Sequence, residues 1–83
     1  MHPSISVIVP AYNAEKTISN CLKNIIDETK DFTKEIIVID DCSTDRTFEK
    51  VKEFTDVKII KLDSNQGVGF ARSYGAKVSN YNT

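Results

Sequence analysis

The sequence predicts an α/β domain in which three strands of one parallel sheet alternate with three helices. Three β-branched apolar runs, at residues 4–9, 35–39 and 57–62, are each followed by a helical pattern. This alternation is typical of a parallel sheet with crossover helices. The first run also lacks a clean apolar–polar alternation, as expected of a strand covered on both faces. With 83 residues, of which 40% are apolar, the chain can form one modest core and is at most one domain.

The first strand is expected to end where a polar loop begins. Pro10 has no N–H to donate to a strand ladder, so we expect it to mark that end. Asn13 is a good N-cap for the following helix, and Glu15 lies where the helix dipole favours negative charge. The helix is predicted to reach about Glu28 and to bury one face, formed by Ile18, Cys21, Leu22, Ile25 and Ile26.

The second strand follows a polar connection at residues 29–34 and leads into a second helix. The alternative N-caps for this helix are Ser43, Thr44 and Asp45. Its buried stripe, at spacings of three residues, is predicted to consist of Phe48, Val51 and Phe54.

A turn-rich loop at residues 63–67 separates the third strand from the last helix, which is predicted at residues 68–79. Gly67 and Gly69 are expected to permit tight backbone geometry before this helix. The residues that the helix is expected to bury are Phe70, Ala71, Tyr74 and Val78.

Composition and charge limit the classes of partner that we expect. The net charge is -1, with 11 basic and 12 acidic residues, which gives no electrostatic reason to expect a nucleic acid or an anionic membrane. Cys21 and Cys42 have no metal-like spacing and are expected to be small packing residues in a reducing cytosol. No apolar run is long enough to span a membrane, and the start of the chain lacks signal-peptide features. We therefore expect a cytoplasmic location, which leaves open a parent protein associated with the cytoplasmic side of a membrane.

Polar clusters follow the first two strands. The first run leads into Tyr12 and Asn13, and the second into Asp40 and Asp41. The carboxyl ends of parallel strands meet at one edge of the sheet, where α/β proteins bind ligands. The sequence therefore predicts a binding site there. The side chains of the adjacent residues Asp40 and Asp41 should diverge, which disfavours a proton-sharing dyad.

Three segments together carry a resemblance to a known family. The segments are VIVPAYNAE at residues 7–15, EIIVIDDCSTD at residues 35–45 and NQGVGFARSYG at residues 65–75. In this order and at these spacings they closely resemble the start of family-2 glycosyltransferases. The resemblance implies the first half of a Rossmann-like GT-A domain, a three-layer βαβαβα unit with parallel sheet order 3-2-1. It also implies a fourth strand carrying Asp-x-Asp beyond residue 83, so we expect the chain to be a truncated, nucleotide-binding piece.

The resemblance assigns nucleotide-binding roles to several residues. Asp41 occupies the position of the acidic residue that accepts a hydrogen bond from the uracil ring. Its alternative role is to cap the second helix or to complete an Asx-turn. Pro10, Ala11 and Tyr12 resemble the loop that cradles uridine, whereas Tyr12 could instead be a hydrophobic plug between the first helix and this loop.

Other residues are expected to act beside this group. Asp40 is expected to bind backbone amides of the first loop, a structural role that competes with direct nucleotide contact. Arg72 is expected to lie near the diphosphate, with a surface salt bridge as the equal alternative. Asn13, Glu15 and Gly67 are expected to support the site indirectly.

The function implied by the resemblance is transfer of a sugar from a nucleotide-diphosphate donor, most simply a UDP-sugar, to an acceptor hydroxyl. The family implies a divalent cation, Mg²⁺ or Mn²⁺, for the full-length enzyme. We expect no catalytic base, metal ligand or bound cation within these 83 residues, and no activity from this piece alone.

Two alternatives remain open at this stage. The piece could be a folded interaction module without a ligand, forming a homo-oligomer through an exposed first strand at Ile5–Val9. It could also be a receiver-type phosphoacceptor. This interpretation fits poorly because the acidic pair would need to follow the first strand, and Asp63 is the only acceptor candidate after the third.

Overall fold

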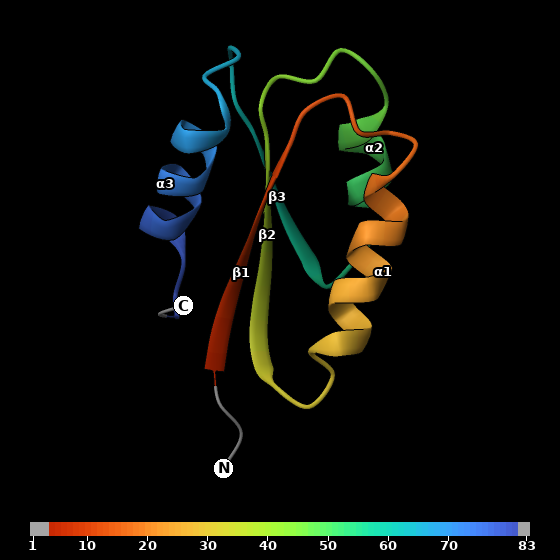
Figure 1. Ribbon diagram of the computed structural model, residues 1–83, viewed down its shortest axis with the longest axis vertical. Helices are drawn as coiled ribbons and strands as arrows, with labels where there is room; N and C mark the ends of the chain where they lie inside the picture. The colour runs from red at the N-terminus through yellow and green to blue at the C-terminus, as the bar shows by residue number, and fades with distance from the viewer. Residues whose placement is uncertain (1–3, 82–83) are drawn as a thin grey trace.

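The computed structural model describes residues 4–81 and forms three layers (Figure 1). In chain order the elements are β1 (Ser4–Ala11), α1 (Ile18–Glu28), β2 (Thr33–Asp40), α2 (Thr47–Lys52), β3 (Val57–Lys61) and α3 (Val68–Val78). The three strands are parallel in the order β1-β2-β3, which confirms the predicted 3-2-1 arrangement. Helices α1 and α2 cover one face of the sheet, and α3 covers the other.

Strand β2 is the centre of the molecule, because its successive side chains enter two separate cores. Ile36 and Val38 pack with the side chains of α1 and α2, including Leu22 and Val51. Ile37 and Ile39 pack on the opposite face, against α3. These four side chains are at most 1% exposed. The strand is therefore covered on both faces, as parallel strands generally are.

Strand β1 extends past the predicted end at Val9 and runs through Pro10 to Ala11. The carbonyl of Ala11 accepts a hydrogen bond from the Asp41 amide at 2.8 Å, so the backbone of Ala11 faces β2. Because backbone groups alternate along a strand, the nitrogen of Pro10 faces away from β2, where a missing N–H breaks no ladder bond. β1 lies at an edge of the described sheet, and self-association through it stays a prediction.

Helix α1 begins at Ile18, several residues after the predicted start, and its N-cap is Thr17. Asn13 is therefore not the helix cap, and Glu15 precedes the first turn instead of lying in it. The physical reason is that side chains of the loop after β2 and of Thr47, the first residue of α2, bind the backbone amides of this segment and hold it outside the helix. Cys21 is exposed, so its predicted place in the core is wrong.

Helix α2 has six residues, and its N-cap position is Arg46. None of the three residues predicted as N-caps therefore occupies that position. Asp45 comes closest to the predicted role, because its Oδ1 accepts the Thr47 amide at 2.9 Å. In the predicted stripe, Val51 is fully buried, whereas Phe48 and Phe54 are partly buried.

The small residues of helix α3 face the sheet. Ala71 and Gly75 are buried, whereas Phe70 and Val78 are 46% and 37% exposed, so their predicted burial is wrong. A Cβ on Gly75 would overlap Ile8 and would lie 3.4 Å from Ile39 Cγ1. This close approach leaves no room for a larger side chain at position 75.

A buried carboxylate fixes the chain where it leaves α3. Glu35, on β2 at the end of the sheet opposite the acidic pair, is 8% exposed and accepts hydrogen bonds from Ser6 Oγ at 2.8 Å and Lys58 Nζ at 2.7 Å. It also accepts the amide of Asn80 and, at 3.1 Å, its side-chain Nδ2. The hydrogen bonds from Lys58, Asn80 and Ser6 outweigh burial and lower the pKa of Glu35 to about 2.

Candidate functional site

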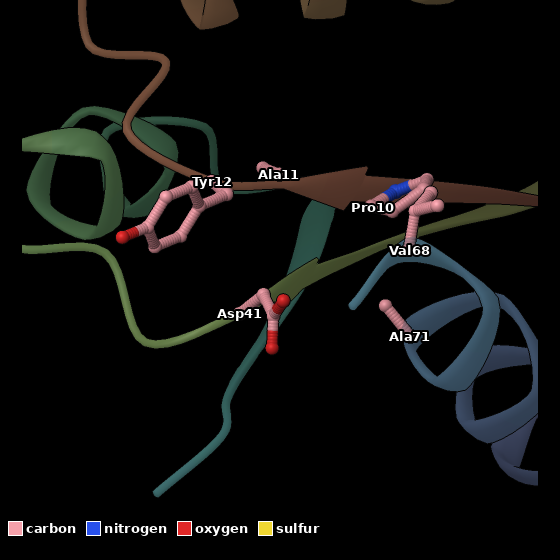
Figure 2. A pocket seen from close by; sticks show the side chains of 6 residues that line it. All are labelled: Pro10, Ala11, Tyr12, Asp41, Val68 and Ala71. Atoms are coloured by element: carbon pink, nitrogen blue, oxygen red, sulfur yellow. The ribbon is translucent and has the colours of Figure 1, made fainter. Parts of the chain in front are cut away.

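The candidate site lies at the carboxyl ends of β1 and β2. Ala11 is paired with Asp40 in the parallel register, so Tyr12 and Asp41 leave the sheet at the same level. A cavity of about 150 Å³ opens there. Its lining is Pro10, Ala11, Tyr12, Asp41, Val68 and Ala71. Figure 2 shows Tyr12 at one side, Asp41 in the middle, and the two α3 residues at the other side.

Asp41 joins this cavity to the loop before α3. Asp41 is 4% exposed, and its carboxylate accepts the amide of Gln66 at 2.6 Å and that of Gly67 at 2.8 Å. These amides belong to the loop at residues 63–67, so the predicted alternative of a cap for the second helix is wrong. Gly67 has φ 93°, a conformation that glycine adopts at little cost, as predicted. Gly69 lies within α3 with no positive φ, so it has no such role.

Asp40 faces the opposite way. It is fully buried, and its Oδ1 accepts the amide of Ser43 at 3.0 Å. The predicted bond with amides of the first loop is wrong, because Ser43 belongs to the loop after β2. The divergence of the two carboxylates is confirmed. Within residues 4–81 the Oδ2 atom of Asp40 has no hydrogen-bond partner.

Tyr12 is 51% exposed, so it is not the hydrophobic plug considered as its alternative role. Its ring lines the open cavity on the first loop, beside Asp41 (Figure 2). A half-exposed aromatic ring at a cavity wall offers an apolar face to a planar ligand.

The loops after β1 and β2 are bound to each other by several hydrogen bonds. The Asn13 amide donates to Ser43 Oγ at 2.9 Å, and Asn13 Oδ1 accepts the Thr44 amide at 2.8 Å. Further along, the Ala14 amide donates to Oγ1 of Thr47, the first residue of α2, at 2.7 Å. Sequence reasoning considered Ser43, Thr44 and Asp45 only as helix caps and missed that they act on another loop. The signal available was a run of short polar side chains, which readily bind backbone groups.

Asp45 accepts the Glu15 amide at 3.2 Å and both the amide and the hydroxyl of Thr47. Desolvation raises the pKa of the Asp45 carboxyl, but the hydrogen bonds from Thr47 and Glu15 outweigh it and keep that pKa below its usual value. The carboxylate therefore stays ionised while it joins the two loops.

The other predicted residues lie farther from the cavity. Arg72 is exposed on α3 and is not part of the cavity lining. In the described part of the chain it forms no ion pair, so the alternative of a surface salt bridge is wrong.

Across residues 4–81, no cluster of three or more His, Cys, Asp or Glu side chains is placed to hold a metal ion. No helix in that range is long and apolar enough to cross a bilayer.

Comparison with known proteins decides the family. A model described as Glycosyl transferase family 2 matches residues 6–82. The chain belongs to glycosyl transferase family 2. The resemblance predicted from the three sequence segments is therefore confirmed.

The relatives of this family-2 chain are much longer proteins. The poly(ribitol-phosphate) beta-N-acetylglucosaminyltransferase TarS of Staphylococcus aureus is 41% identical over 68 residues, which are 75% of this chain and 12% of that protein. The glucosyltransferase WfgD of Escherichia coli is 37% identical over 75 residues, 88% of this chain and 29% of WfgD. The family-2 chain thus spans less than a third of either relative.

A solved structure supports the same family. The crystal structure of S. aureus TarS 1–349 superposes with a TM-score of 0.74 and 35% sequence identity. The match covers 94% of the family-2 chain and 24% of the TarS chain. The fold is that of a GT-A glycosyltransferase domain, which confirms the predicted fold class.

Proposed function

We propose that this chain binds the nucleoside of a nucleotide-diphosphate sugar, with uracil as the base. In the whole protein, this binding would hold the donor while the sugar passes to an acceptor hydroxyl. Membership of glycosyl transferase family 2 supports the reaction class. The full name of the relative WfgD includes UDP-Glc, which supports uridine for this chain.

The observation that carries the proposal is the Asp41 carboxylate beside the Tyr12 ring in one cavity. An ionised carboxylate only accepts hydrogen bonds, so it selects a base edge that presents an N–H, such as N3–H of uracil. Each carboxylate oxygen has two lone pairs, so Asp41 can bind the loop amides and a base together. Those amides also hold the carboxylate in place before the ligand arrives.

The size of the cavity supports binding of one part of the donor. Pockets that enclose a drug-sized ligand measure roughly 300–1,000 Å³. The cavity here is about 150 Å³. We therefore assign to it the base, stacked on Tyr12, with the remaining donor groups outside. Contact of Arg72 with the diphosphate stays a prediction, and so does the inactivity of the 83 residues alone.

The test is an NMR titration of the 83-residue chain with UDP and, as a matched control, CDP. Cytosine has an unprotonated N3 acceptor in place of the uracil N3–H, so it places a lone pair against the carboxylate. We expect UDP to shift the Tyr12 and Asp41 amides with a Kd no better than about 0.1–1 mM. We expect CDP to bind at least about tenfold more weakly.

The outcomes separate the nucleoside from its alternatives. Equal binding of UDP and CDP would contradict recognition of uracil N3–H by Asp41, and no shift at Tyr12 or Asp41 would remove the site. GDP belongs in the same series because guanine also presents N–H groups to a carboxylate. Tighter binding of GDP than UDP would keep the site and replace uracil with guanine.

A further inference from the structure

Tyr12 depends on its neighbours for its position. Within residues 4–81, the Tyr12 side chain takes part in none of the hydrogen bonds, and the ring is half exposed. Ala11 on one side is held by the β1–β2 ladder. Asn13, on the other side, is the first residue of the loop after β1 that forms hydrogen bonds. The direction of the ring therefore follows from the backbone of these two neighbours.

Asn13 has an unusual backbone conformation. Its φ is 49°, in the left-handed region that asparagine and glycine tolerate better than other residues. This turns the chain sharply just after Tyr12. A residue that resists the left-handed conformation would pull the loop toward a different path.

Asn13 is also bound in both directions to the loop after β2. Its amide donates to Ser43 Oγ at 2.9 Å. Its Oδ1 accepts the Thr44 amide at 2.8 Å and the Thr44 hydroxyl at 3.3 Å. Ser43 and Thr44 follow Asp41 by two and three residues. The contacts of Asn13 thus connect the segment that carries Tyr12 to the segment that carries Asp41.

We propose that Asn13 is a positioning residue of the nucleoside site, which sets the Tyr12 ring against Asp41 through its left-handed backbone and its Oδ1 bonds to Thr44. This inference rests on the proposed function for its consequence in binding. Its geometric content, the placement of Tyr12 relative to Asp41, is independent of any ligand.

Three variants test this role. Asn13→Gly keeps the left-handed backbone and removes Oδ1, whereas Asn13→Asp keeps both the backbone tolerance and an acceptor oxygen. The matched control is Asn80→Gly, which removes one side-chain bond of 3.1 Å to Glu35 at the opposite end of the sheet.

Nucleotide-free NMR spectra decide the geometric part. We expect Asn13→Gly to shift or broaden the Tyr12 ring and amide signals and the Thr44 amide, and Asn13→Asp to restore them. Asn80→Gly should leave these signals unchanged, although it lowers stability. A purely structural role for Asn13 would lower stability as Asn80→Gly does and leave the Tyr12 signals in place, which would overturn the proposal.

UDP titration of the same variants decides the functional part. We expect Asn13→Gly to raise the Kd roughly fivefold to tenfold, and Asn13→Asp and Asn80→Gly to stay within about twofold of the parent chain. Equal Kd values for Asn13→Gly and Asn80→Gly would overturn the proposal. Failure of the parent chain to bind UDP would refute the proposed function instead, and the nucleotide-free spectra alone would then decide the role of Asn13.

Discussion

At the scale of single residues, two adjacent carboxylates have different roles because successive side chains of a strand point to opposite faces. Asp40 faces the layer of α1 and α2 and accepts the Ser43 amide at 3.0 Å. Asp41 faces α3 and reaches the cavity. The period of two in β2 therefore assigns one carboxylate to the structure of the loop and the other to the candidate site.

Replacement of Asp41 by asparagine should affect both binding and stability. The side-chain amide of the variant would turn an N–H group toward one of the two loop amides that now donate to the carboxylate. We expect Asp41→Asn to lose the preference for UDP over CDP and to lower the free energy of unfolding by about 1.5–3 kcal/mol, the contribution of hydrogen bonds to a charged group. Urea denaturation and the two titrations measure these effects.

The matched control is Asp63→Asn, the same change at an exposed residue of the loop that Asp41 binds. It should alter stability by no more than about 0.5 kcal/mol, as surface substitutions usually do. Retention of UDP selectivity by Asp41→Asn would contradict the reading of the base by this carboxylate.

At the scale of elements, the position of α3 depends on a glycine. Gly75 faces Ile8 on β1 and Ile39 on β2, and its missing side chain lets the helix lie close to the sheet. The same helix supplies Val68 and Ala71 to the cavity wall. A substitution at Gly75 should therefore also change the position of these two residues in the cavity wall.

The pair of variants Gly75→Ala and Gly69→Ala tests this packing within one helix. At Gly75 the new methyl group would overlap Ile8, so we expect a loss of about 1–3 kcal/mol in the free energy of unfolding. At Gly69 nothing lies within 4 Å, and the better helix propensity of alanine should stabilise by up to about 1 kcal/mol. Urea denaturation of both variants provides the measurement. Equal effects would show that α3 does not pack tightly at Gly75.

At the scale of the whole molecule, the sheet is held at both ends by carboxylates. Asp41 binds the loop that enters α3, and Glu35 binds the chain that leaves it. Ser6 extends the second contact, because its hydroxyl accepts the Tyr81 amide at 3.0 Å and donates to Glu35. Both ends of α3 are therefore joined to β2, the strand at the centre of the fold.

Glu35 should make the stability of the molecule depend on pH in acid. Its pKa is about 2 in the folded protein, against an ordinary value of 4.5. The unfolded chain therefore binds more protons between these values, so the contribution of Glu35 is complete above about pH 4.5 and is lost as the pH falls toward 2.

The variant Glu35→Gln isolates this contribution. We expect the variant to be less stable than the parent chain at pH 7. The difference in stability should shrink as the pH falls from about 4.5 to 2, because only the parent has an ionised group at position 35 to lose. Urea midpoints at pH 7, 4 and 3 check this. A constant difference between the two proteins over that range would contradict the role of Glu35.

Local patterns along the chain were enough to predict the order of strands and helices, the resemblance to family 2 and the meeting of Tyr12 with Asp41. These patterns are β-branched runs, helical spacing and the rule that parallel strands end at one edge. Strand parity also predicted the divergence of Asp40 from Asp41, although not the partner that Asp40 binds.

The start of α1, the role of Asn13 and the exposure of Phe70 and Cys21 depended instead on tertiary contacts. Local signals favoured a cap at Asn13, but side chains some 30 residues away bind the amides of this segment. Likewise, the burial of Gly75 in place of Phe70 depends on how closely α3 approaches Ile8. Such outcomes are competitions between local and distant partners, and a sequence displays only the local ones.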